Sequence, residues 1–373
     1  MLQRSYTNRI AYLGRRKIKN MLLLFGSTCA LVAGILIYTK SRKNWPLVFH
    51  EILYEIKYNV LGSKGLIIDR LEARYNKTDM PRKTGKIAIV TGGSRGIGAT
   101  VVKMLLQCDM EVIIACRAPA AGEKAIREIR KSGVNDGIAK VYELDNADLN
   151  SVRRFADCIK RDYSRIDVLV NNAGIMFTPY AETKDGFEQQ WAINYLSHFL
   201  LTSLLLPLLK NGGSPSECAR VVNVSSCAHL VGIINFENIN YKEQFITSAA
   251  YAQSKLAQVM FTKSLQQLFT EKQLHIKTYA VHPGIVNTDL FNDTLLSKYF
   301  KWLLPLIFKT PTEGATPIVY AAVSKSVEER GGIYISNCKE SPVNPLVSDA
   351  SILDRLFELS LKQVRLNDFF QEL

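Results

Sequence analysis

The sequence predicts an α/β fold, a single domain with a doubly wound parallel sheet, preceded by a basic segment that contains a transmembrane helix. From residue 86 onward, short β-branched runs alternate with stretches of helical periodicity. The runs are continuously apolar, as strands buried on both faces are, and the spacers between them are long enough for crossover helices. Strands are predicted at 86–91, 111–116, 138–144, 166–171, 219–224, 275–281 and 331–335, and helices at 96–107, 121–132, 148–162, 187–209, 249–271 and 311–325.

The basic excess of the chain lies in its N-terminal part. The 373 residues carry a formal net charge of +13. Residues 1–86 hold 17 Lys and Arg against 5 Asp and Glu, whereas residues 87–373 hold 30 against 29. Because the globular part is nearly neutral, the charge argues against nucleic acid as a partner and favours an anionic membrane surface. The 7 cysteines are scattered without metal-ligand spacing, so neither a zinc site nor a disulfide framework is predicted.

An uncharged apolar run at 21–38 follows a basic segment at 1–20. As a helix with a rise of about 1.5 Å per residue, the run spans about 27 Å, close to the hydrocarbon thickness of a bilayer. We predict a retained single-pass anchor rather than a cleaved signal peptide or a mitochondrial targeting segment. The basic linker at 39–84 is predicted to contain a short helix, lying along the lipid headgroups or packed in the ordinary way.

The remaining chain is divided into an α/β domain at 85–345 and a C-terminal helix at 346–373. The last segment has apolar residues at helical spacing, which predicts a helix docked on the domain. With the anchor, this organisation predicts a membrane protein, and we expect it in the endoplasmic reticulum membrane or on a lipid droplet. Whether the domain faces the cytosol or the lumen is left open.

A glycine-rich turn directly follows the first predicted strand and precedes a helix. Gly92 allows a sharp turn, Gly96 lets the backbone approach a pyrophosphate, and Gly98 allows the helix to pack closely on the strand. The N-terminus of the helix offers N–H groups and a favourable dipole to an anion. This position predicts dinucleotide binding, although the glycine spacing differs from the commoner G-x-G-x-x-G. The binding residues of the loop are Gly92, Ser94, Arg95, Gly96, Ile97 and Gly98.

The residue after the second predicted strand is Arg117. A site that prefers NAD usually has Asp or Glu there, to bind the ribose 2′-hydroxyl. Arg95 supplies a second guanidinium group, and two guanidinium groups suit the additional phosphate of NADP. We therefore predict a preference for NADP(H), with NAD(H) use left open. The alternative is that both arginines are solvated surface residues.

Tyr251 and Lys255 lie four residues apart, on one face of a predicted helix. A free phenol has a pKa of about 10, and a nearby cation brings that pKa toward the working range of a proton carrier. Tyr251 could then take a proton from an alcohol or give one to a carbonyl. Ser225 and Ser226 end the fifth predicted strand, where a hydroxyl can hydrogen-bond a substrate oxygen.

Together these residues resemble the short-chain dehydrogenase/reductase family. The chain has TGxxxGIG at 91–98, NNAG at 171–174, YxxxK at 251–255 and HPGIVNT at 282–288, in that order. The resemblance implies a Rossmann-type domain that works without a metal. It also implies a catalytic tetrad with Asn194 for a proton-relay water, Ser226 for substrate orientation, Tyr251 as acid and base, and Lys255 for ribose binding and pKa control. Further cofactor contacts are implied for Asp145 near the adenine, Asn172 beside the ribose, Thr288 at the phosphate or carboxamide, and the neighbouring Asn146, Ala173, Gly174, Pro283 and Gly284.

Within the family, the chain resembles the retinol dehydrogenase-like branch. The inserted HLVGIINFENINY is similar to that branch, and YAQSKLAQVMFT and LIFKTPTEGA are most similar to a polyprenol dehydrogenase in it. Arg117 departs from the uncharged residue expected in that relative. The resemblance implies a lipophilic alcohol or aldehyde as substrate, a retinoid or polyprenol, with a steroid left open.

The apolar segment at 290–308 is either a lipophilic lid over the substrate or an ordinary buried helix pair. The alternatives for the whole protein are a catalytically inactive cofactor-binding scaffold and a sugar-nucleotide epimerase. A homodimer built on the long fourth and fifth helices is also left open.

Overall fold

The computed structural model describes residues 45–243, 245–286 and 308–373, in two compact units, Met1–Leu71 and Glu72–Leu373. The described part of the first unit is helix α2 (Trp45–Leu71). The predicted anchor and Thr288 lie outside the described residues, as does nearly all of 290–308. In the described ranges no single helix combines the length and apolar composition of a membrane span; one helix pair bent by 63° does so on those criteria alone.

The second unit is built around one eight-stranded sheet in the order β3-β2-β1-β4-β5-β6-β7-β8. Strands β1 to β7 are parallel, and the short β8 runs antiparallel to β7. The seven predicted strands all form, within a few residues of the predicted bounds. The strands are β1 (Ile87–Thr91), β2 (Glu111–Cys116), β3 (Ile138–Glu143), β4 (Val168–Asn171), β5 (Ala219–Val224), β6 (Ile276–His282), β7 (Ile333–Ser336) and β8 (Lys339–Glu340).

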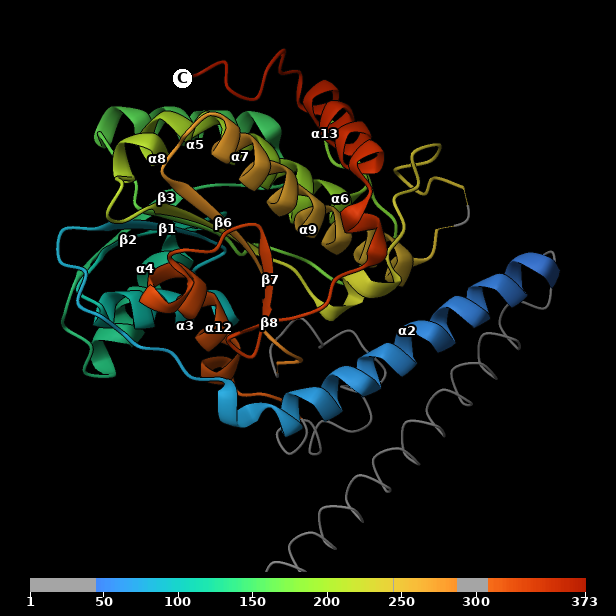
Figure 1. Cartoon of the computed structure of the whole chain (residues 1–373), viewed down its shortest axis with the longest axis horizontal. Coiled ribbons are helices and arrows are strands. Elements are labelled where there is room, and N and C mark those ends of the chain that lie inside the picture. Colours follow the sequence, from blue (N-terminus) through green and yellow to red (C-terminus); the bar gives the residue numbers. More distant parts are fainter. Residues whose placement is uncertain (1–44, 244, 287–307) are drawn as a thin grey trace, which may run out of the picture. The chain divides into compact units, whose positions relative to one another are not determined.

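Helices cover both faces of the sheet, so the predicted doubly wound Rossmann-like architecture is confirmed (Figure 1). Helices α3, α4 and α12 contribute to the core on one face, and α5, α7, α9 and α13 to the core on the other. Their bounds are α3 (Gly96–Gln107), α4 (Pro119–Lys131), α5 (Leu149–Asp162), α6 (Gln189–Trp191), α7 (Ser197–Leu204), α8 (Leu206–Gly212), α9 (Thr247–Glu271), α12 (Pro311–Val323) and α13 (Ala350–Val364).

The strand order reverses between β1 and β4. The chain first builds the sheet outward from β1 to β3 and then returns to place β4 on the other side of β1. The loops after β1 and β4 therefore leave the carboxyl edge in opposite directions. In open parallel sheets the ligand crevice lies at this point.

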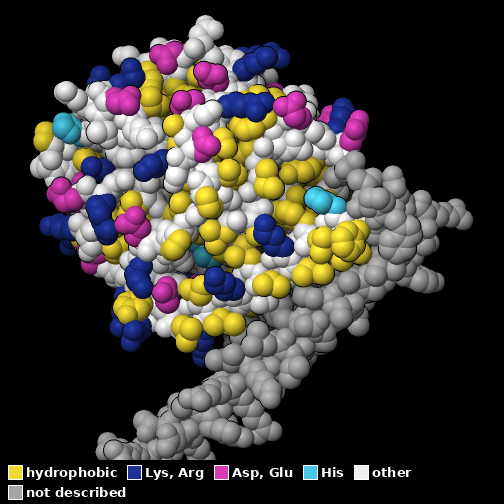
Figure 2. Space-filling view, turned by 45° about the vertical axis from the view of Figure 1, so that its right-hand side comes forward, with side chains coloured by type: hydrophobic (Ala, Val, Ile, Leu, Met, Phe, Trp, Pro, Cys, Tyr) yellow, Lys and Arg dark blue, Asp and Glu magenta, His cyan; other side chains and the backbone are white. Residues whose placement is uncertain are grey.

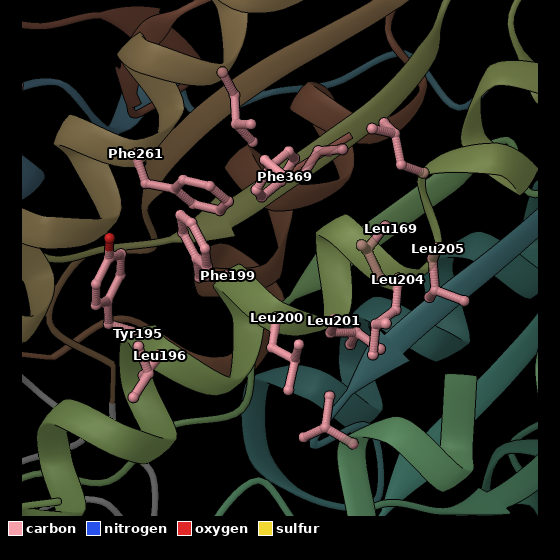
Figure 3. Close-up of a cluster of buried hydrophobic side chains, with 14 of the residues drawn as sticks. Leu169, Tyr195, Leu196, Phe199, Leu200, Leu201, Leu204, Leu205, Phe261 and Phe369 are labelled. Atoms are coloured by element: carbon pink, nitrogen blue, oxygen red, sulfur yellow. The ribbon is translucent and has the colours of Figure 1, made fainter. Parts of the chain in front are cut away.

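Aromatic side chains fill the core between the sheet and helices α7, α9 and α13 (Figure 3). The ring of Phe369, beyond the end of α13, lies 5.1 Å from that of Phe199 on α7 and 5.9 Å from that of Phe261 on α9. The Ser203 hydroxyl also donates a hydrogen bond to the Phe369 carbonyl, at 2.6 Å. The C-terminal helix thus packs into the same compact unit as the sheet.

The prediction of one continuous helix at 187–209 is wrong, because the structure divides this stretch into several helical segments. Helix α6 runs into a π-helical turn at Ala192–Leu196, α7 follows, and α8 begins after a bend. Pro207 lies in the first turn of α8, and a proline cannot donate the backbone hydrogen bond that would continue α7. The apolar side chains run through both breaks, so hydrophobic periodicity alone does not reveal them.

Candidate active site

The loops after β1 and β4 are joined by the hydroxyl of Thr91, which is fully buried. This oxygen accepts hydrogen bonds from the backbone N–H groups of Asn172 and Ala173, both at 2.9 Å. The Asn172 side chain completes the junction by donating to the Thr91 carbonyl at 2.8 Å. The residue predicted to lie beside the ribose therefore uses its amide to hold two loops together. Sequence reasoning did not assign Thr91 a role, although it is the first residue of the TGxxxGIG motif.

The glycine-rich loop has the backbone geometry that its three key glycines were predicted to provide. Gly92 and Gly96 have positive φ angles of 66° and 57°, a region that side chains other than glycine rarely adopt. A Cβ atom on Gly98 would lie 2.3 Å from the Gly92 carbonyl oxygen, so only glycine permits this contact between α3 and the loop. Helix α3 begins at Gly96, which places open N–H groups where an anion would bind.

The remaining loop residues are fixed by packing. Ser94 hydrogen-bonds the thiol of Cys116 at the end of β2, and Ile97 packs against the core formed by α3 and α12. Arg95 immediately precedes α3, and Arg117 immediately follows β2; both side chains are exposed. Because β1 and β2 are adjacent parallel strands, both arginines lie at the same edge of the sheet.

The predicted adenine-side residues follow β3. Asp145 is half-buried, and one of its carboxylate oxygens accepts a hydrogen bond from the Ala147 N–H at 3.0 Å. The buried Asn146 accepts a hydrogen bond from the Ser197 hydroxyl at 3.1 Å, which ties it to α7. Both side chains are therefore held in place by their own neighbours.

Two further predicted contacts flank the site. Pro283 and Gly284 follow β6, and Gly284 has a positive φ of 88°. A Cβ on Gly174 would lie 3.2 Å from the Asn194 side-chain oxygen and 3.5 Å from the Lys255 ammonium nitrogen. The loop that contains Gly174 therefore passes close to two residues of the predicted tetrad.

Tyr251 and Lys255 lie on α9 and face the end of β5. The Tyr251 hydroxyl lies beside the Ser226 side chain, which lowers the pKa of the phenol. The Lys255 ammonium donates to the Val224 carbonyl at 2.9 Å and lies 5.7 Å from the centroid of the Tyr251 ring. Tyr251 and Lys255 are 5% and 4% exposed, so the pair lies in a largely dehydrated position.

Ser225 and Ser226 have different partners. The Ser225 hydroxyl is buried and donates to the Lys255 carbonyl at 2.7 Å. The Ser226 hydroxyl is the one that reaches Tyr251, and it also accepts from the Ala228 N–H at 3.2 Å. The geometry thus supplies a physical reason for choosing Ser226, which the sequence offered only through family spacing.

Burial controls the protonation of both groups. It raises the pKa of Tyr251, and the nearby Ser226 side chain only partly opposes this effect. It lowers the pKa of Lys255 to about 7. Loss of hydration therefore dominates both values in the protein alone, and the effect of the ammonium on the phenol in the cofactor complex stays a prediction.

Asn194 lies in the π-helical turn and is fully buried. Its side-chain oxygen accepts from the Ile175 N–H at 2.8 Å, and its amide donates to the Ile175 carbonyl and the Ser254 hydroxyl, each at 3.0 Å. A π-turn adds one residue to a helical turn and is frequent at functional sites. Here it lets one amide join the loop after β4 to helix α9.

Two residues that sequence reasoning missed connect these parts. The Gln258 amide donates to the Asn194 carbonyl and contacts the His198 ring nitrogen Nδ1 at 3.0 Å. The other ring nitrogen of His198 lies 3.1 Å from the Thr91 hydroxyl. Burial lowers the pKa of His198 to about 3, so the ring is neutral. His198 follows Asn194 by four residues and Gln258 follows Tyr251 by seven, so a polar residue at helical spacing was the available signal.

A family model described as short chain dehydrogenase matches residues 86–297 of the chain. The chain belongs to the short-chain dehydrogenase family. The matched range contains every strand from β1 to β6 and all the described residues of the predicted tetrad. The family assignment therefore covers the whole carboxyl edge described above.

Curated relatives of this short-chain dehydrogenase act on alcohols, as their names state. A polyprenol dehydrogenase from Homo sapiens is 40% identical over 280 residues, covering 74% of this chain and 84% of that protein. Retinol dehydrogenase 14 from Homo sapiens is 38% identical over 318 residues, covering 80% of this chain and 92% of that protein.

Solved structures give the same result for the fold. An uncharacterised protein from Mycobacterium paratuberculosis has a TM-score of 0.63 and 34% identity, covering 77% of this chain and 96% of that chain. The Pseudomonas aeruginosa RhlG/NADP active-site complex has a TM-score of 0.55 and 25% identity, covering 69% of this chain and 96% of that chain.

Proposed function

We propose that this protein is an NADP(H)-preferring oxidoreductase that interconverts a lipophilic alcohol, of the retinoid or polyprenol class, with its aldehyde or ketone. The observation that carries the proposal is the position of Tyr251 beside Ser226, one helical turn from Lys255, at the carboxyl edge of the sheet. The names of the relatives support the substrate class.

The roles of the chain's own residues follow from this arrangement. Bound nicotinamide supplies the acceptor or donor of the hydride. Tyr251 takes the hydroxyl proton as the alcohol is oxidised, or returns it as the carbonyl is reduced, and Ser226 hydrogen-bonds the same substrate oxygen. Because a buried phenolate is costly, a protonated Lys255 beside the ring offsets that cost. The tetrad is completed by Asn194, which positions the loop after β4.

The residues at the edge of the sheet fit a dinucleotide. The glycine-rich loop and the N-terminus of α3 hold the pyrophosphate, and the missing side chain at Gly174 leaves Asn194 and Lys255 uncrowded. Arg95 and Arg117 bind the 2′-phosphate of NADP. The other assigned contacts are Ser94, Ile97, Asp145, Asn146, Asn172, Ala173, Pro283, Gly284 and Thr288.

The protein acts at a membrane, with the run at 21–38 as its anchor, in the endoplasmic reticulum or on a lipid droplet. Helix α2 supports this part of the proposal, because its exposed apolar residues recur at helical spacing and exposed Lys57 and Lys64 lie among them. These apolar residues are Phe49, Leu53, Ile56, Val60, Ile68 and Leu71. Figure 2 shows a face of the molecule where hydrophobic side chains gather with Lys and Arg between them.

The substrate class is tested by measuring turnover of retinol, geranylgeraniol and a 3-hydroxysteroid by the full chain in detergent or liposomes. We expect kcat/KM to be highest for one of the first two alcohols. If the protein binds the cofactor but neither oxidises any of the three alcohols nor reduces any of the matching carbonyls, the result would instead support the inactive scaffold.

The cofactor preference is tested with Arg117→Asp. A hydrogen bond to a charged group contributes about 1.5–3 kcal/mol, so the ratio of KM for NADP to KM for NAD should rise at least about tenfold. Arg127→Asp makes the same charge change at another exposed arginine, on α4, and serves as the control. Equal effects of the two substitutions would refute the assignment of Arg117.

A further inference from the structure

Phe177, in the loop after β4, has a backbone conformation that a bulky residue rarely adopts. Its φ angle is +58°, in the left-handed region. For a residue with an aromatic side chain this conformation is strained, and it persists only when the surroundings impose it. Such residues concentrate at ligand and active sites.

This conformation is imposed by a set of hydrogen bonds around the buried side-chain amide of Gln190, which we call the amide bracket. The Gln190 side chain is fully buried, and its oxygen accepts from the Phe177 N–H at 3.0 Å. The amide nitrogen of Gln190 donates to the Thr247 carbonyl at 3.1 Å, and the Thr247 hydroxyl donates to the Thr178 carbonyl at 2.9 Å. Thr247 is the first residue of α9, four residues before Tyr251. The strained loop is therefore fastened to the helix that carries the acid/base residue.

The bracket holds the Phe177 ring against Tyr251. The two ring centroids are 6.0 Å apart with an interplanar angle of 60°, an edge-to-face contact. Phe177 is half-buried, whereas Tyr251 is nearly covered. The phenylalanine is thus a partly exposed apolar wall beside a buried phenol.

We propose that Phe177 is a specificity-determining residue that selects slender primary alcohols with an apolar chain over bulky secondary alcohols. A primary alcohol has one carbon substituent at the carbinol carbon, and a secondary alcohol has two. A fixed ring beside Tyr251 leaves less room for the second substituent, while its apolar surface favours an isoprenoid chain. This inference rests on the proposed function and narrows it to retinol-like and polyprenol-like substrates.

The test compares geranylgeraniol, a primary isoprenoid alcohol, with androsterone, a secondary steroid alcohol, in the full chain with NADP. Phe177→Gly removes the ring and also relieves the strained backbone, since glycine adopts a positive φ freely. In this variant we expect the ratio of kcat/KM for geranylgeraniol to kcat/KM for androsterone to fall by about tenfold or more, the effect of reshaping an apolar pocket. The same ratio for Phe177→Leu should lie between the values for Phe177→Gly and the wild type.

Two controls separate specificity from stability. The melting temperature of Phe177→Gly should not fall. Phe236→Ala removes another half-buried phenylalanine, whose ring faces Arg355 at 4.1 Å, and should leave the ratio unchanged.

The dissociation constants of both alcohols are measured in parallel. If the wild type turns over neither alcohol, the proposed function fails, and a changed ratio of dissociation constants in Phe177→Gly still supports the role of the ring. An unchanged ratio of dissociation constants and of kcat/KM in Phe177→Gly overturns the inference, whether or not the proposed function stands.

Discussion

Replacing Ser226 and Ser225 by alanine, one at a time, separates the catalytic hydroxyl from the structural one. Of these two serines, only Ser226 acts on the pKa of the Tyr251 phenol. Loss of one donor aimed at a reacting oxygen typically lowers kcat by about 10²–10³, which corresponds to about 2.7–4 kcal/mol of transition-state stabilisation. We expect that loss for Ser226→Ala. Its effect on stability is limited to the cap on Ala228, about 0.5–2 kcal/mol.

Ser225→Ala should have the opposite profile. The Ser225 hydroxyl is 2% exposed and satisfies the Lys255 carbonyl at 2.7 Å. The Lys255 carbonyl lies inside α9 and keeps its helical backbone partner, so losing this additional hydrogen bond costs about 0.5–1.5 kcal/mol of folding free energy. The variant should melt a few degrees lower while kcat/KM stays near the wild-type value.

The assay follows the absorbance of the reduced cofactor with geranylgeraniol as substrate, and thermal melting is recorded for the same preparations. Full activity in Ser226→Ala, together with a large loss in Ser225→Ala, would refute the assignment. A large loss in both, with unchanged melting temperatures, would show that the two hydroxyls act as one unit.

Four further outcomes follow from the same geometry. Tyr251→Phe should lower kcat by about 10²–10⁴ while the Kd for NADP, measured by fluorescence titration, changes little. Gly98→Ala places a Cβ 2.3 Å from the Gly92 carbonyl, so it should cost about 1–3 kcal/mol or more in urea unfolding and weaken NADP binding. Burial lowers the pKa of Lys255 to about 7, below the ordinary value of about 10.4, so between these pH values the unfolded chain binds more protons than the folded chain. This group therefore makes the unfolding free energy rise with pH across that window. Lys255→Met should exceed the wild type in unfolding free energy by more at pH 6.5 than at pH 8.5. Urea unfolding without cofactor measures this difference. Gln258→Met removes the donor to the Asn194 carbonyl and should lower kcat more than it changes KM, in steady-state kinetics with a melting curve as control.

The sequence was sufficient to predict the sheet and to predict which polar motifs meet at its carboxyl edge. Parallel strands buried on both faces are continuous apolar runs, and the polar motifs that follow them necessarily meet at one edge. Motif spacing also predicted that Tyr251 and Lys255 lie on one face of a helix, because local helical geometry places residues four apart on the same face.

The parts that could not be predicted depend on contacts distant in the sequence. Nothing local distinguishes Ser225 from Ser226, since both contact α9 and the difference is which of them lies beside the Tyr251 side chain. The π-turn around Asn194 is stabilised by Ile175 and Ser254 from other elements. The protonation of Tyr251 depends on how completely the fold excludes water, and sequence spacing says nothing of that.

The buried position of Phe369 has a consequence for when the protein can fold during its synthesis. The Phe369 ring lies among those of Phe199 and Phe261. Phe199 is on α7, which follows the turn that contains Asn194, and Phe261 is on α9, which carries Tyr251. During synthesis those aromatic surfaces emerge long before residue 369 does, so the nascent chain exposes them to solvent. Uncovered aromatic surface makes a growing chain prone to aggregation and a target for chaperones. The enzyme's helical layer can therefore close only after translation has passed residue 369.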